Sequence, residues 1–105
     1  MPTFLLAYHG GRMAETDEEQ EQVMNDWMTW FGAVGEAMKD PGMPVIRART
    51  IGDDGAVSDG GGDNPVSGYS VLEADSLDAA VEAAKGCPVL KSGGSIEVAE
   101  VGMAD

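Results

Sequence analysis

Two arginines of this chain have the type and spacing needed to bind an anion. Arg47 and Arg49 are separated by one residue in the alternating segment PVIRARTI, so a β-strand there would present both guanidinium groups on one side. Paired guanidinium groups bind a carboxylate or a phosphate in a bidentate manner. The alternative is a cross-strand ion pair with Glu73 or Glu97, which also lie in alternating segments. We expect either an anion site or a structural ion pair here.

His9 is the only histidine, and it ends the apolar segment TFLLAYHG just before two glycines. Imidazole gains and loses a proton near neutral pH, which suits a general acid or base. The alternative is a hydrogen-bonded structural histidine at the end of a strand. We take His9 as a catalytic candidate. Tyr69, Glu73 or Glu97 would orient it if their strands lie side by side.

The composition restricts the partners of this protein. Its 105 residues include 19 acidic and 6 basic side chains, giving a net charge of −13. This charge repels nucleic-acid phosphates and anionic membranes, so we expect neither as a partner. Hydrophobic residues make up 43% of the chain, which indicates a packed fold rather than disorder. We expect a single domain over residues 1–105.

The cysteine content and the N-terminus indicate a cytoplasmic protein. One cysteine, Cys87, excludes an internal disulfide and fits a reducing compartment. No base is evident beside it, which favours a structural thiol over a nucleophile. The N-terminal apolar run is short and has no basic segment before it, unlike a signal peptide. No stretch of the sequence reaches membrane-spanning length.

The glycine-rich segment DGGGDNP, residues 59–65, does not match the known ligand-binding loops. A phosphate loop leads into a helix and often carries a lysine, whereas this segment leads into a predicted strand and carries aspartates. Its oxygen-bearing residues lack the alternate spacing of a calcium loop. One histidine and one cysteine, far apart in sequence, do not make a zinc site. We expect a turn bordering a pocket, with no metal and no organic cofactor.

The predicted elements occur in the order strand, helix, strand, strand, helix, strand. Apolar or alternating residues predict the four strands at 3–9, 44–51, 68–74 and 95–101. Thr16 and Glu19 form a capping box at the start of a long helix that ends at Asp40-Pro41-Gly42, and Ser76 caps the second helix. This order predicts a ferredoxin-like α+β fold, with an antiparallel four-stranded sheet and two helices on one face.

Alternation divides the side chains of each strand between the two faces of the sheet. The more apolar set is expected under the helices: Phe4, Leu6, Tyr8, Ile46, Ala48, Thr50, Ser70, Leu72, Ala74, Ile96 and Val98. The other set mixes aliphatic and charged side chains: Leu5, Ala7, His9, Val45, Arg47, Arg49, Ile51, Tyr69, Val71, Glu73, Glu97, Ala99 and Val101. A closed core does not tolerate so many charges, and a solvated face does not need so many aliphatic residues. We expect a shared barrel interior, partly closed by a second copy.

Five segments resemble the YCII-related domain family in its DGPF-like branch: FLLAYHGG, WMTWFGAVGEAMKDPGMPV, DGAVSDGGG, GYSVLEADSLDAAVEAAKGCPVL and GGSIEVAEV. The resemblance covers nearly the whole chain. It implies a dimeric α+β barrel, in which two such sheets pack face to face. It also implies a mostly bacterial group proposed to include small-molecule enzymes, some of them associated with sigma-factor genes.

The site residues of that family are matched only in part. The resemblance implies a His–Asp pair with the histidine in the first helix, but the corresponding segment MNDWMTWFG has no histidine. Asp40 loosely matches the aspartate near the end of the helix, and His9 is then the candidate for the base. Asp59-Gly60 stands at the DG of the DGPF motif, where Gly61-Gly62 replaces Pro-Phe.

Two functions are compatible with these residues. The first is a small-molecule enzyme of lyase, isomerase or hydrolase type, with His9 and Asp40 as catalytic residues. Its substrate, a small anionic molecule, is expected to contact Arg47, Arg49, Tyr69, Glu73 and Glu97. The second is a non-catalytic dimeric module that binds a ligand or a partner protein.

Overall fold

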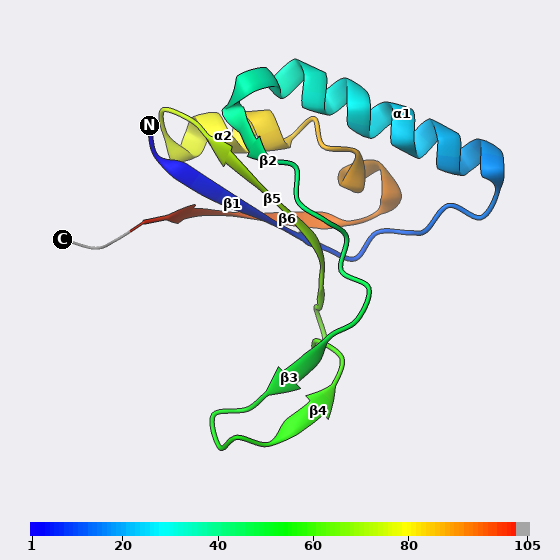
Figure 1. Cartoon of the computed structure of the whole chain (residues 1–105), viewed down its shortest axis with the longest axis vertical. Coiled ribbons are helices and arrows are strands. Elements are labelled where there is room, and N and C mark those ends of the chain that lie inside the picture. Colours follow the sequence, from blue (N-terminus) through cyan, green and yellow to red (C-terminus); the bar gives the residue numbers. More distant parts are fainter. Residues whose placement is uncertain (103–105) are drawn as a thin grey trace.

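A four-stranded antiparallel sheet and two helices form the body of the protein (Figure 1), which a computed structural model describes over residues 1–102. The strand order is β2–β5–β1–β6. The strands are β1 (Thr3–His9), β2 (Met38–Asp40), β5 (Val66–Glu73) and β6 (Ser95–Val101). The helices α1 (Asp17–Val34) and α2 (Leu77–Ala84) lie on the same face of the sheet. The predicted ferredoxin-like α+β fold is therefore confirmed.

The core lies between this sheet and the two helices. Phe4 and Leu6 of β1 are fully buried. Leu72 of β5, which pairs with Phe4, is fully buried as well. Trp30 of α1 is also buried and donates its indole N–H to the carbonyl oxygen of Ala83 at 3.0 Å, which ties α1 to α2. The apolar face predicted for the segments that form β1, β5 and β6 is confirmed, since alternate residues of these strands pack under the helices.

Both helices begin at the predicted caps. The Thr16 hydroxyl accepts the N–H of Glu19, and the Ser76 hydroxyl accepts the N–H of Ala79, both at 3.1 Å. The Glu19 carboxylate accepts the N–H of Glu15 rather than that of Thr16, so half of the expected capping box forms. The predicted end of the first helix is wrong, because α1 stops at Val34 and a short 3₁₀ turn, η1 (Gly35–Ala37), leads into β2.

The strand predicted at 44–51 is also wrong. The fourth strand of the sheet is β2, and Pro44 makes only an isolated bridge to Gly68. Proline has no N–H to extend a strand ladder, and the chain leaves the sheet just after it. Residues 45–65, here called the arm, project on the side opposite the helices (Figure 1). Within the arm, β3 (Arg49–Ile51) pairs with β4 (Val57–Asp59) as a separate hairpin.

The arm carries side chains that the sequence placed under the helices. Ile46, Ala48 and Thr50 are all exposed, and Ile46 is 94% exposed. The glycine-rich segment forms a turn in the returning half of the arm, as predicted. The radius of gyration is 15.1 Å, whereas a compact chain of this length has about 13 Å. The projecting arm accounts for this difference.

Candidate functional site on the open sheet face

The face of the sheet opposite α1 and α2, here called the open face, carries alternate side chains of β1, β5 and β6. They are Thr3, Leu5, Ala7, His9, Tyr69, Val71, Glu73, Glu97, Ala99 and Val101. Ala7 pairs with Tyr69 on one side and with Glu97 on the other. Because neighbouring strands lie about 4.8 Å apart, a phenol and a carboxylate flank one small residue. His9 lies on the same face, two residues further along β1.

The imidazole of His9 is held by backbone carbonyl groups. Its Nδ1 lies 3.0 Å from the carbonyl oxygen of Asn64 and 3.2 Å from that of Pro65. A carbonyl oxygen only accepts hydrogen bonds, so Nδ1 carries the hydrogen and Nε2 of the neutral ring is the acceptor. Glu97 Oε1 lies 3.9 Å from Nε2. Within residues 1–102, Nε2 is buried and has no hydrogen-bond partner.

A β-bulge explains how these carbonyl groups reach the ring. The pairing of β1 with β5 shifts between Tyr8, which faces Gly68, and His9, which faces Val66. Ser67 is the extra residue on β5. A bulge bends its strand and redirects the neighbouring residues. The chain returning from the arm thereby brings the Asn64 and Pro65 carbonyl groups to His9.

The other predicted catalytic residue, Asp40, lies elsewhere on the sheet. It ends β2 and pairs with Val71, so β5 separates it from β1. The register places it about 13 Å along the strands from His9 as well as two strands away. Its carboxylate accepts the N–H of Gly42 at 2.9 Å, which closes the turn after β2. The structure therefore does not bring Asp40 and His9 together.

The predicted anion-binding residues are divided between the sheet and the arm. Glu73 lies on the open face and pairs with Lys39 at 3.2 Å. Arg47 and Arg49 are both exposed on the arm. Arg49 Nε lies 3.7 Å from Asp59 Oδ1 on the facing strand, so its cross-strand partner is neither Glu73 nor Glu97. Arg47 has no ion pair among the described residues.

A buried chain of hydrogen bonds lies on the helix side of the same strands. The Tyr8 hydroxyl donates to Ser70 Oγ at 2.7 Å, and Ser70 Oγ donates to the carbonyl oxygen of Pro41 at 2.6 Å. Burial raises the pKa of Tyr8 well above its ordinary value of 10.0. Burial likewise raises the pKa of Cys87, which is 1% exposed. A nucleophilic cysteine needs a lowered pKa, so the expected structural thiol agrees with this environment.

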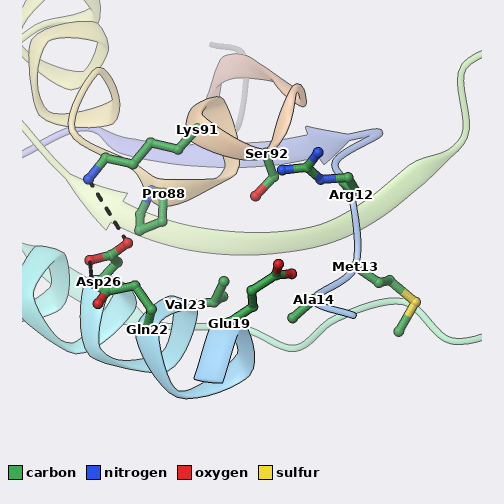
Figure 2. A pocket seen from close by; sticks show the side chains of 10 residues that line it. All are labelled: Arg12, Met13, Ala14, Glu19, Gln22, Val23, Asp26, Pro88, Lys91 and Ser92. Atoms are coloured by element: carbon green, nitrogen blue, oxygen red, sulfur yellow. Dashed lines mark hydrogen bonds and ion pairs between the residues drawn. The ribbon is translucent and has the colours of Figure 1, made fainter. Parts of the chain in front are cut away.

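Two surface depressions lie away from the open face. One, of about 260 Å³, lies between the segment after β1, α1 and the 3₁₀ turn η2 (Pro88–Ser92) (Figure 2). Figure 2 shows Lys91 and Asp26 facing one another at its edge, with 4.0 Å between Nζ and Oδ2. The other depression is lined by Val81, Ala84, Lys85, Leu90, Ile96 and Val98. Neither contains a residue predicted from the sequence to act in catalysis or binding.

The described residues limit two further classes of site. Over residues 1–102, no three side chains of the types His, Cys, Asp and Glu are grouped to hold a metal ion. In the same range, neither helix combines the length and the apolar character needed to cross a bilayer.

The sequence analysis missed the contribution of the backbone to this site. The carbonyl groups of Asn64 and Pro65 determine which nitrogen of His9 carries the hydrogen. A backbone carbonyl leaves no side-chain pattern in a sequence. The only available signal was the Asn64-Pro65 dipeptide, which indicates a turn but not what the turn faces.

Comparison with known proteins shows the fold. No protein-family model and no curated protein sequence matches the chain. Among solved structures, it is similar to 5-chloro-2-hydroxyhydroquinone dehydrochlorinase (TftG) from Burkholderia phenoliruptrix AC1100 in complex with 2,5-dihydroxybenzoquinone. The TM-score is 0.58 at 17% sequence identity, over 97% of this chain and 95% of the other. Membership of the YCII-related family stays a prediction.

Proposed function

We propose that this protein is a small-molecule enzyme related to the YCII domains, which performs acid–base chemistry on a hydroxylated ring compound at the open face. His9 is the base in this proposal. The observation that carries it is the pair of carbonyl groups at Nδ1, which leaves Nε2 as a proton acceptor on the same face as Glu97 and Tyr69. Nε2 is buried in the free chain, so the proposal requires the exposed Glu97 side chain, 3.9 Å away, to move aside when the ligand binds. Its expected location is the cytoplasm.

The reaction class that fits best is a lyase-type elimination. One ring hydroxyl would first become a carbonyl as a proton is taken up at the ring carbon that carries the leaving group. His9 Nε2 would then accept the proton of a second hydroxyl, and as that oxygen forms its C=O bond the displaced electron pair would move through the ring and expel the leaving group as an anion. Tyr69 and Glu97 would contact the ring oxygens from either side of Ala7. The dehydrochlorinase with the similar fold supports this class, because its name describes the removal of hydrogen chloride from a chlorinated hydroxyhydroquinone.

We further propose that the protein works as a homodimer in which two open faces pack together. The chain exposes 7529 Å², whereas a compact monomer of this mass exposes about 5,600 Å². The excess of about 1,900 Å², which includes the surface of the projecting arm, exceeds the roughly 800 Å² per partner of a standard interface. Half-buried aliphatic residues such as Leu5 and Val71 give the open face an apolar centre suited to such packing.

Binding of 2,5-dihydroxybenzoquinone, measured by calorimetry, tests the ligand class and the site together. His9→Asn keeps a donor near the Nδ1 position and removes Nε2, so we expect about a tenfold loss of affinity from one lost charge-assisted hydrogen bond. Lys91→Ala, in the depression on the helix side, is the matched control and should bind as the wild type does. Equal affinity of wild type and His9→Asn would contradict the proposed site.

Release of chloride from 5-chloro-2-hydroxyhydroquinone tests the catalytic half of the proposal. Turnover by the wild type, lost in His9→Asn, supports an enzyme. Binding without turnover would instead identify a ligand-binding module.

A further inference from the structure

The open face of one copy does not supply the positive charge that an anionic ligand needs. Besides Tyr69, its ionisable groups are His9, Glu73 and Glu97, and Lys39 at its border is paired with Glu73. The hydroxyl groups of a dihydroxybenzoquinone are conjugated to ring carbonyls and ionise readily, so the bound ligand is an anion. In a protein of net charge −13, a fixed local cation is required to hold it.

The arm carries two of the chain's six basic residues, Arg47 and Arg49, and holds them away from the sheet of its own copy. The arm also exposes large apolar side chains, Ile46, Ile51 and Val57. An isolated two-stranded hairpin is at best marginally stable in water, so the arm needs a surface to pack against. These two features point to one occupant of that surface, a second copy of the chain.

The reach of the arm matches the spacing of two packed sheets. Val45 still donates its N–H to the carbonyl oxygen of Ser67 at 3.0 Å, which marks where the arm leaves the sheet. An extended chain carries Arg47 up to about 7 Å and Arg49 up to about 13 Å beyond this point. Sheets packed face to face lie about 10 Å apart. When the arm runs straight out from the sheet, backbone positions 47 and 49 therefore lie on either side of the level at which a second sheet would lie.

The partner for these cations on the second sheet is identified by elimination. Of the two glutamates on the open face, Glu73 is paired with Lys39, whereas the side chain of Glu97 is 73% exposed and, among residues 1–102, has only the His9 ring beside it, at 3.9 Å from Nε2. Glu97 lies at the same end of the sheet as His9 and the base of the arm. A two-fold axis running roughly along β1 would bring these ends of two copies together.

We propose that the arm of each copy crosses onto the open face of the other and completes its ligand site. Arg47 of one copy meets Glu97 of the second copy, and its guanidinium group faces the ligand bound beside His9 there. Arg49 lies at the rim of the same site. This inference rests on the proposed dimer and on the proposed ligand class, and it adds the residues that neutralise the ligand.

Cross-linking of mixed variants tests this arrangement directly. An affinity-tagged Arg47→Cys chain is mixed with an untagged Glu97→Cys chain and treated with a short thiol-to-thiol cross-linker. Cys87 is left in place because it is buried, and wild type treated identically shows its background. The expected product is a covalent heterodimer of one tagged and one untagged chain. Arg12→Cys, an exposed arginine outside the arm, replaces Arg47→Cys as the matched control and should give none.

The possible outcomes distinguish the crossing of the arm from the proposed dimer and from the proposed ligand class. If sedimentation shows dimers but positions 47 and 97 do not cross-link, the proposed crossing of the arm is wrong and the proposed dimer is still supported. A monomer at all concentrations would remove both. If the cross-link forms, Arg47→Gln should weaken 2,5-dihydroxybenzoquinone binding about tenfold relative to Arg12→Gln. An equal affinity of these two variants would overturn the role of Arg47 in binding, and no binding by the wild type would overturn the ligand class alone.

Discussion

The His9 imidazole and the Asn64 carbonyl group are joined across 55 residues of sequence, with 3.0 Å between Nδ1 and the carbonyl oxygen. This contact connects the last residue of β1 to the chain that returns from the arm. It determines the tautomer of the only histidine and also fixes the base of the arm. One side chain therefore links the proposed base to the segment proposed to complete the site of a second copy.

Two substitutions of His9 separate its structural and chemical contributions. His9→Asn retains a donor near the Nδ1 position, whereas His9→Gln places its amide nearer to Nε2. We expect His9→Gln to lose about 1 kcal/mol more unfolding free energy than His9→Asn, because it abandons the carbonyl groups of Asn64 and Pro65. Urea denaturation measures the difference. Equal losses in the two variants would show that the carbonyl contact does not stabilise the fold.

Alkaline pH should destabilise the protein through Tyr8. The folded state keeps the phenol protonated because burial raises its pKa, while in the unfolded chain it ionises near its ordinary value of 10.0. Stability from this group is therefore complete below about pH 10 and falls by about 1.4 kcal/mol per pH unit above it. The raised pKa of Cys87 adds a similar loss that begins near its ordinary value of 9.0.

Tyr8→Phe should flatten this dependence, as followed by denaturant unfolding between about pH 8 and about pH 11. Tyr69 is the only other tyrosine and is 37% exposed, so Tyr69→Phe is the matched control. The control is expected to keep the wild-type slope. A slope unchanged in Tyr8→Phe would exclude Tyr8 as its source.

The cap of α1 makes a contribution that can be measured on its own. Thr16→Ala removes the acceptor for the N–H of Glu19 and should cost about 1 kcal/mol of unfolding free energy. Thr16→Ser keeps the hydroxyl and should recover most of that loss. Thermal or chemical denaturation of both variants measures the effect, and an equal loss in both would point to the methyl group rather than the cap.

Ile46 distinguishes an arm that packs on a partner from one that stays in solvent. Its side chain is 94% exposed in one copy, so Ile46→Ser should change monomer stability by less than about 0.5 kcal/mol. In the dimer the same change should weaken association by about tenfold or more, because it removes buried apolar area. Sedimentation equilibrium over a concentration series measures the constant. Unaltered association would place Ile46 outside the interface.

The sequence predicted correctly those strands in which the alternating pattern corresponds to one face covered by the helices. Strand β6 was predicted at its observed bounds, because SIEVAEV alternates and one of its faces packs on the helices. The segment 44–51 alternates equally well, yet only part of it forms a strand, and that strand is solvated. Alternation reports that two sides of a segment differ, but it does not report which surface covers either side.

The main gap in the predicted site has the same origin. His9, Tyr69 and Glu97 lie on strands whose alternation was readable, and the structure places them on one face. Arg47 and Arg49 were also expected on that face, because the segment 44–51 was predicted as a strand of the sheet, whereas β2 takes that place. Strand β2 was not predicted. Its three residues continue the helical pattern of the preceding segment, and three residues are too few to show the alternation of a strand.

The tautomer of His9 is the most direct test of the central claim, and a chain with one histidine gives one imidazole spin system. Long-range ¹H–¹⁵N correlation spectra at neutral pH should show a protonated Nδ1 and an unprotonated Nε2, with the Nε2 resonance shifting when 2,5-dihydroxybenzoquinone is added. A hydrogen on Nε2 in the free protein, or an Nε2 resonance that does not respond to bound ligand, would contradict the account.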